Sequence, residues 1–368
     1  MPKRPVLLSL ALLASPAIQA QGGSAPGAAP DAAALQACAA IGAPADRLDC
    51  YDRALGRAVE APPAAAAATP APDASDSLIA PKGELLREDA ASPPPSLLTR
   101  YWELDAGSKR GRFNLVGYRP IYAMPLHITS RINRAPSSPT QAAVPQPSYR
   151  REEAKFQISL RTKLAQDFLL PGGDLWAAYT QQAMWQIYDG RNSRPFRNTD
   201  YEPELIYVLP TPKGLRRLPF DWQWRYALLS VAHQSNGQSD PLSRSWNRVN
   251  LAAGIDRGNW ALVARVSQRI TEPYSEDNNP DLTLYRGRAE LQLSWAGGRH
   301  TLQMLLRSNL RHVGQYGAFQ MEWTYPVFAD QPNGMRWYVQ AFHGYGETLS
   351  DYNFRQTSLG LGLSFLQF

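Results

Sequence analysis

The feature that most constrains the fold of this chain is a repeated alternation of apolar and polar residues. It recurs from about Tyr101 to the C-terminus, in segments of roughly ten residues. One segment places four apolar residues on one parity and three polar residues on the other: Phe319, Met321, Trp323 and Tyr325 against Gln320, Glu322 and Thr324. Because successive side chains of a strand point to opposite faces, the pattern predicts β-strands with one apolar face.

The first residues explain where such strands would lie. Lys3 and Arg4 precede an apolar run, and small residues end at Ala20, which indicates a secretory signal peptide over residues 1–20. The apolar run is too short to cross a bilayer, and no later stretch reaches roughly 18 apolar residues. Only helices and closed barrels satisfy their backbone groups in lipid, so a membrane location for this exported chain requires a barrel.

Composition favours the membrane barrel over its rival, a secreted β-sandwich. Mean hydropathy is −0.38, and the 10 Trp and 17 Tyr suit a polar interior with aromatic girdles at the membrane interfaces. The rival sandwich would also alternate, but its two sheets would share one core. We expect an all-β, antiparallel transmembrane barrel of about twelve strands, near residues 113–123, 154–164, 174–187, 201–210, 222–235, 244–255, 259–270, 283–296, 300–311, 315–327, 336–346 and 355–367.

The region before the barrel divides into two parts. Residues 21–58 contain both cysteines, Cys38 and Cys50, and predict a short helical periplasmic segment clipped by a disulfide; two free thiols are the alternative. Residues 59–97 are rich in Ala and Pro and predict a linker, which leaves residues 98–368 for the barrel. The net charge of +6 comes without a compact Lys/Arg run, so no nucleic-acid partner is expected.

One segment carries candidate chemistry. His233 and Ser235 are two residues apart, so on a strand they share a face, and the imidazole can serve the hydroxyl as general base. Asn247 is a candidate third member, because a turn through residues 236–243 brings the next strand alongside. These residues share parity with apolar neighbours such as Leu229 and Leu251, which predicts that the site faces outward, toward lipid.

The pattern alone also has an unremarkable interpretation. A His-x-Ser pair on a strand often arises by chance, and taken alone it favours no chemistry. Polar, ionisable groups on the lipid face of a barrel, however, cost stability, most of all near the midplane. Function explains such a cost more readily than packing does.

The sequence closely resembles the outer membrane phospholipase A family of Gram-negative bacteria over residues 98 to 368. The resemblance rests on agreement in residue type and spacing across several blocks. They are His233-Gln-Ser235-Asn-Gly237, Ser239-Asp240-Pro241, Ser243-Arg-Ser-Trp-Asn247-Arg248, Tyr179-Thr-Gln181, Pro195-Phe-Arg197, Tyr201-Glu-Pro203, Gly344-Tyr-Gly-Glu347 and Asp351-Tyr-Asn-Phe354.

The resemblance implies a calcium-dependent phospholipase of the A1/A2 and lysophospholipase type, with Ser235, His233 and Asn247 as its triad. It implies that the main-chain N–H of Gly237 is the oxyanion donor, and that membrane phospholipids are the substrates. It also implies calcium ligands at Ser243, at the carbonyl of Gln238, where the family commonly has Arg, and at Ser193 of a second subunit in an active homodimer.

Gln181, on the strand before the Ser193 loop, is placed to form a hydrogen bond across that dimer interface. An inward-facing residue bonded to its neighbours is an equally good interpretation of Gln181. Two rival functions also remain open: a lipid A deacylase and a non-catalytic structural barrel. The flanking blocks argue against the first, and the intact Ser/His/Asn set argues against the second.

Overall fold

A computed structural model describes residues 32–55 and 95–365. The chain forms two compact units, Met1–Ser77 and Leu78–Phe368. The expected signal peptide, residues 1–20, and most of the expected linker, residues 59–97, lie outside the described residues. Within the described part, no helix has the length and apolar character needed to cross a membrane.

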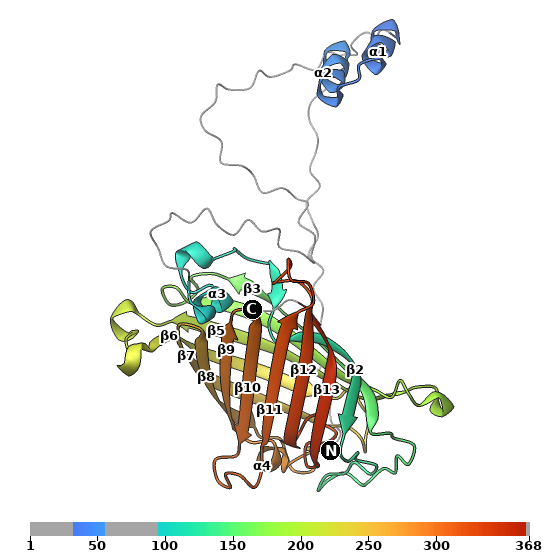
Figure 1. Cartoon of the computed structure of the whole chain (residues 1–368), viewed down its shortest axis with the longest axis vertical. Helices are drawn as coiled ribbons and strands as arrows, with labels where there is room; N and C mark the ends of the chain where they lie inside the picture. The colour runs from blue at the N-terminus through green and yellow to red at the C-terminus, as the bar shows by residue number, and fades with distance from the viewer. Residues whose placement is uncertain (1–31, 56–94, 366–368) are drawn as a thin grey trace, which may run out of the picture. The chain divides into compact units, whose positions relative to one another are not determined.

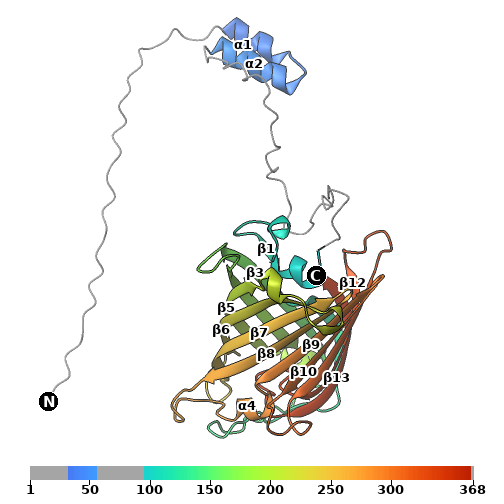
Figure 2. The ribbon, with the colours of Figure 1, turned by 90° about the vertical axis from the view of Figure 1, so that its left-hand side faces the viewer.

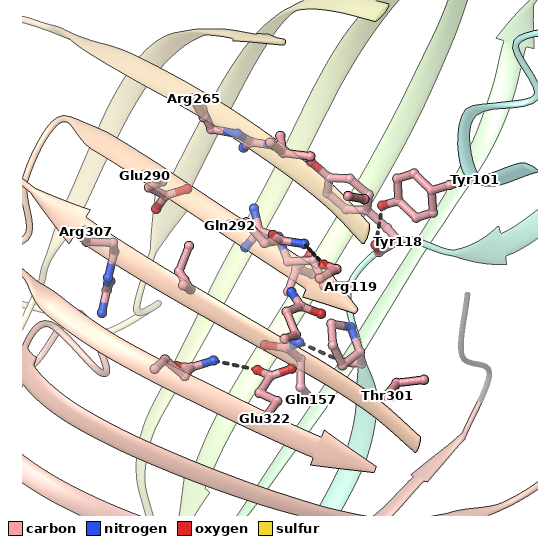
Figure 3. A pocket seen from close by; sticks show the side chains of 18 of the residues that line it. Tyr101, Tyr118, Arg119, Gln157, Arg265, Glu290, Gln292, Thr301, Arg307 and Glu322 are labelled. Carbon is pink, nitrogen blue, oxygen red and sulfur yellow. Dashed lines mark hydrogen bonds between the residues drawn. The ribbon is translucent and has the colours of Figure 1, made fainter. Parts of the chain in front are cut away.

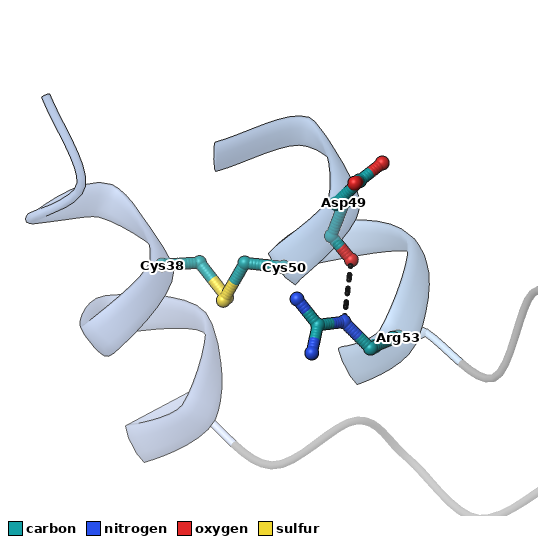
Figure 4. Close-up of a disulfide and its surroundings, with 4 residues drawn as sticks. All are labelled: Cys38, Asp49, Cys50 and Arg53. Atoms are coloured by element: carbon teal, nitrogen blue, oxygen red, sulfur yellow. Dashed lines mark hydrogen bonds between the residues drawn. A yellow bond between two sulfur atoms is a disulfide. The ribbon is translucent and has the colours of Figure 1, made fainter. Parts of the chain in front are cut away.

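The first unit contains two short helices, α1 (Ala32–Ala39) and α2 (Pro44–Ala54). Pro44 occupies the first turn of α2, where its missing N–H leaves no hydrogen bond unmade. A disulfide joins Cys38 to Cys50, with Cα atoms 5.4 Å apart, and ties the two helices together (Figure 4).

The second unit is a closed antiparallel barrel of twelve strands, as the sequence predicted (Figures 1 and 2). Each strand pairs with the next, and the last pairs with the first to close the barrel. The strands are β2 (Ile121–Thr129), β3 (Glu152–Ala165), β4 (Asp174–Trp185), β5 (Phe196–Pro210), β6 (Gln223–Ser235), β7 (Ser245–Arg257), β8 (Trp260–Ile270), β9 (Ala289–Gly297), β10 (His300–Ser308), β11 (Ala318–Pro326), β12 (Arg336–Tyr345) and β13 (Arg355–Phe365).

Shorter elements complete the unit. A three-residue strand, β1 (Leu115–Gly117), pairs with β3 just before β2 begins. The helical elements are α3 (Leu97–Trp102), α4 (Leu282–Tyr285) and the 3-10 turns η1 (Ala106–Ser108), η2 (Gly190–Asn192), η3 (Lys213–Leu215) and η4 (Pro219–Asp221).

Two predicted strands were misplaced. The strand expected at 113–123 is interrupted, because Pro120 has no N–H for the ladder, and the main pairing begins only at Ile121. The strand expected at 283–296 begins at Ala289, and helix α4 takes the earlier residues. Gly287 separates them with φ +95°, and a Cβ there would lie 2.5 Å from the Ser308 backbone.

The alternation that predicted the strands also sorts the two faces of the barrel. On β6 and β7, Leu229 and Leu251 are 50% and 57% exposed on the outer face. Asn250 and Glu204 are buried in the interior, where both contact the Ser230 hydroxyl. The barrel is therefore apolar outside and hydrogen-bonded inside, as lipid surroundings require.

The end of the barrel at which β13 finishes is closed by α3, which the sequence did not predict (Figure 1). Ser96 caps the helix by accepting from the Thr99 N–H, and Leu98 and Trp102 pack into the interior. The guanidinium of Arg161 stacks on Trp102, 4.3 Å from its ring centroid. We call this the turn end, and the opposite end, with its longer connections, the loop end.

Between the two ends, the interior holds a polar cavity of about 280 Å³. Figure 3 shows arginines and carboxylates pointing into it, among them Arg119, Arg265, Arg307, Glu290 and Glu322. The predicted triad does not line this cavity. Any chemistry of the triad therefore takes place on the other side of the barrel wall.

Candidate active site on the outer face of the barrel

The candidate base and its partner lie opposite each other on adjacent strands. His233 on β6 and Asn247 on β7 are direct cross-strand neighbours. His233 Nδ1 and Asn247 Oδ1 are 2.8 Å apart, which is a hydrogen-bonding distance. The connection of residues 236–244 thus brings the two side chains together, as the spacing predicted.

Ser235 is the last residue of β6, two positions beyond His233 and on the same face. Its cross-strand neighbours are Tyr201 on β5 and Ser245 on β7. The Ser235 side chain is half-buried at the loop end, whereas His233 is exposed. A reacting ester could therefore approach both groups from outside the barrel.

The surroundings of these three residues are apolar and open to the outside. Val231, directly before His233 on the same face, is 50% exposed, and Leu229 continues the row. Such a surface contacts acyl chains when the barrel lies in a bilayer. The site consequently meets lipids rather than solutes that enter the barrel.

The loop after Ser235 is organised by one buried side chain, Asn236. Its Oδ1 accepts from the Arg244 N–H at 2.9 Å and from the Gln238 N–H at 3.3 Å. Its Nδ2 donates to the Leu242 carbonyl at 2.8 Å. The bonds to Leu242 and Arg244 cross the loop, so they hold its two halves together next to Ser235.

Gly237 occupies a position that only glycine suits. Its φ is +63°, and a Cβ would lie 2.9 Å from the ring of Tyr201. No intramolecular hydrogen bond engages its N–H within residues 32–55 and 95–365. An N–H in this state, two residues from Ser235, can serve an oxyanion.

The expected calcium ligands fall on two loops of the loop end. Gln238 and Ser243 lie on the loop after Ser235, and Ser193 ends the turn η2 between β4 and β5. The Ser243 hydroxyl accepts from Asn278 Nδ2 at 2.8 Å and keeps a second lone pair. Among the described residues, no three His, Cys, Asp or Glu side chains are grouped to hold a metal.

Gln181 lies on the outer face of β4, which removes the inward-facing alternative. It pairs with Ile158 on β3, which is 47% exposed, and shares parity with exposed Tyr179. The Tyr179 hydroxyl donates to Gln181 Oε1 at 3.1 Å. The Gln181 side chain therefore lies on the lipid-facing side of β4.

The loop of residues 346–354 folds into the mouth of the barrel and supports the site from within. Arg197 bridges Glu153 and Asp351, at 2.6 Å to each carboxylate. Burial by itself would raise the pKa of Glu347, but the Lys155 ammonium and the His127 imidazole hold that pKa well below its usual range. These contacts give a structural role to motif residues whose purpose the sequence did not reveal.

The sequence did not point to Glu272. It lies two residues beyond β8, and its Oε1 accepts a hydrogen bond from Asn247 Nδ2 at 2.9 Å. The two residues are 25 positions apart. Only the β7–β8 register and the path of the following loop bring them together, so no local pattern could have identified the pair.

Comparisons with known proteins agree with this fold. The family model described as "Phospholipase A1" matches residues 98–365. A putative phospholipase A1 of Neisseria meningitidis serogroup B is 37% identical over 292 residues, which is 77% of this chain and 74% of that protein. Phospholipase A1 of Escherichia coli K12 is 36% identical over 214 residues, 58% of this chain and 70% of its own.

Two solved structures share the barrel. Outer membrane phospholipase A from Escherichia coli superposes with a TM-score of 0.60 and 31% identity, over 70% of this chain and 93% of that one. The outer membrane phospholipase of Salmonella typhi, solved as a dimer with bound calcium, gives 0.61 and 33%, over 70% and 94%. These two structures resemble the chain in sequence as well as in fold.

Proposed function

The chain belongs to the phospholipase A1 family, an ester hydrolase family of the outer membrane, and we propose that Ser235, His233 and Asn247 form its catalytic triad. The observation that carries this proposal is the outward-facing His233–Asn247 hydrogen bond beside Ser235, in a row of exposed apolar residues. Its substrates would be the acyl esters of membrane phospholipids, cleaved at the sn-1 or sn-2 position, and lysophospholipids.

The proposed reaction begins when Ser235 Oγ attacks the ester carbonyl. His233 Nε2 takes the hydroxyl proton and then delivers it to the oxygen of the leaving lysophospholipid. Asn247 accepts from Nδ1–H and so keeps Nε2 free to act as base. The Gly237 N–H stabilises the negative charge on the carbonyl oxygen. Water, activated in the same way, then releases the acyl group from Ser235.

Replacing Gly237 by alanine should lower kcat about 100-fold, because the added Cβ meets the Tyr201 ring and displaces the oxyanion donor. The measurement is fatty-acid release from phospholipid micelles. Gly258→Ala is the matched control: it also has positive φ, +52°, but its Cβ would meet nothing within 4 Å. Equal activity of the two variants would remove Gly237 from the mechanism.

The oxygens of the two expected ligands on one loop are of the kind that calcium binds, but a complete calcium site has more ligands than these two. The Ser243 hydroxyl and the Gln238 carbonyl are hard, neutral donors, and calcium takes six to eight oxygen ligands. Because Gln238 would contribute its main chain, its side chain need not resemble the family's arginine. When bound, the ion would supply positive charge near the developing oxyanion. Two oxygens of one subunit are too few for tight binding of calcium, which favours a shared site.

We propose that two copies of the chain share this site, with Ser193 of one copy completing the calcium shell of the other. Gln181 on the outer face of β4 would donate across the same interface. Linkage then requires calcium to promote dimers to the degree that dimers promote calcium binding. An enzyme that is always surrounded by substrate would thereby stay inactive as a monomer.

Calcium should convert detergent-solubilised protein from an inactive monomer to an active dimer, and a chelator should reverse the change. Sedimentation and phospholipid hydrolysis, measured on the same samples, test this. Ser193→Ala should weaken both responses to calcium, whereas Ser275→Ala, another loop hydroxyl, should leave them unchanged. Equal activity of the monomer in chelator would refute the calcium and dimer roles and leave the triad proposal intact.

The same assay separates the rival functions. A lipid A deacylase would release acyl chains from lipid A but not from defined glycerophospholipids, and a structural barrel would release none.

We also propose that residues 1–20 are a cleaved signal peptide and that residues 21–58 form a periplasmic segment held by the Cys38–Cys50 disulfide. Thiol labelling without reductant should find both cysteines blocked.

A further inference from the structure

A carboxylate lies behind Asn247, on the side away from His233. Asn247 on β7 pairs with Ile270, the last residue of β8, and the chain leaving β8 carries Glu272 back to the asparagine. Glu272 Oε1 is 2.9 Å from Asn247 Nδ2, and Asn247 Oδ1 is 2.8 Å from His233 Nδ1. An unbroken chain of hydrogen bonds therefore connects Glu272, just beyond the end of β8, through Asn247 on β7 to the base on β6.

This chain of bonds decides which way the Asn247 amide faces. An amide can present either its oxygen or its NH₂ group, and the two orientations have nearly the same shape. An ionised carboxylate can only accept, so Glu272 requires the NH₂ group and leaves the oxygen toward His233. The oxygen in turn requires a proton on Nδ1, which keeps Nε2 unprotonated and able to take a proton. The reversed amide would favour the wrong tautomer.

The charge of Glu272 is only partly compensated. Arg269 faces it with an N–O distance of 3.9 Å, but the same guanidinium lies 2.7 Å from Asp277. The Glu272 side chain is 28% exposed, so solvent weakens its field without removing it. A negative charge one amide away favours the imidazolium that forms when Ser235 loses its proton.

We propose that Glu272 is a positioning residue of the hydrolytic site, which orients the Asn247 amide and supplies the negative charge that a Ser-His-Asn set lacks. This inference rests on the function proposed above. Glu272 contacts neither substrate nor Ser235, and it acts through Asn247 alone. A neutral asparagine backed by a carboxylate thus approaches what an aspartate would do in its place.

Glu272→Gln tests the proposal because it keeps the size of the side chain and removes its charge and its preference for a donor. We expect kcat to fall about 10-fold, as for other residues that hold a catalytic side chain in position through a hydrogen bond, with little change in KM. The acid limb of the pH profile of kcat/KM should move to lower pH, because the imidazolium loses a favourable charge. Glu276→Gln, an exposed carboxylate on the same loop, should change neither value.

A second pair of variants guards against a purely structural effect. Asn247→Asp should be impaired because two carboxylates then face each other. In the double variant with Glu272→Gln, the new amide NH₂ group can donate to the new carboxylate, and kcat should rise about 10-fold above that of Asn247→Asp. A structural role predicts that the double variant is worse than either single one.

The outcomes separate the two proposals. If the wild type hydrolyses phospholipids and Ser235→Ala does not, the proposed function stands. Glu272→Gln with unchanged kcat and an unmoved acid limb, or a double variant without recovery, would then overturn the role of Glu272 alone. An inert wild type would overturn the function itself.

Discussion

Ser235→Ala should lose phospholipid hydrolysis by a factor on the order of 10⁴ or more, because it removes the hydroxyl that would form the acyl-enzyme with His233 as its base. The change removes one oxygen from a half-buried side chain and leaves the barrel intact. Fatty-acid release from mixed micelles at saturating calcium measures the loss.

Ser245→Ala is the matched control for this prediction. Ser245 is the direct cross-strand neighbour of Ser235 and shares its face with Asn247, so it presents a second hydroxyl to the same surroundings. Its loss should leave activity within about twofold of wild type, as for substitutions away from the reacting atoms. A large loss in Ser245→Ala, with activity retained in Ser235→Ala, would mean that the nucleophile has been misassigned.

Arg197→Met should lower the free energy of unfolding of the barrel by about 3–5 kcal/mol, the cost of removing one partner from a buried charge cluster. Arg197 bridges Glu153 and Asp351, all three side chains are nearly inaccessible, and the variant leaves two buried carboxylates without a cation. Urea unfolding in lipid vesicles, followed by tryptophan fluorescence, gives the measurement.

Activity should fall along with stability in this variant. Asp351 holds the 346–354 loop, and Ser350 of that loop accepts a hydrogen bond from Asn236 Nδ2 at 3.3 Å. Arg299→Met, in an exposed turn at the turn end, should change stability by less than about 0.5 kcal/mol. Equal unfolding midpoints for the two variants would show that the ion pairs of Arg197 with Glu153 and Asp351 contribute little to the stability of the barrel.

The parts of the fold that follow from a local period could be predicted from the sequence. Alternation identifies the barrel strands because each has one lipid-facing and one interior face, and a shift by one residue would reverse both. The outward direction of His233, Ser235 and Asn247 follows from the same parity. Their proximity needed only a short connection between two neighbouring strands.

The parts that depend on tertiary contacts could not be predicted. Helix α3 has six residues, too few for a helical period to emerge from the sequence, and it exists because Leu98 and Trp102 pack inside the barrel. The role of Glu272 depends on where the chain goes after β8, and that of Glu347 on how a loop folds inward. The face of Gln181 stayed open because Thr180, Gln181 and Gln182 are all polar and do not alternate.

The central claim is that Ser235, on the outer face of the barrel, is the nucleophile of an ester hydrolase. Reaction with a sulfonyl fluoride, followed by peptide mass spectrometry and parallel activity measurements, tests it most directly. We expect a single adduct on Ser235 that forms at the rate at which hydrolysis is lost and forms far more slowly in His233→Ala. Complete inactivation with Ser235 unmodified, or with the adduct on another residue, would contradict it.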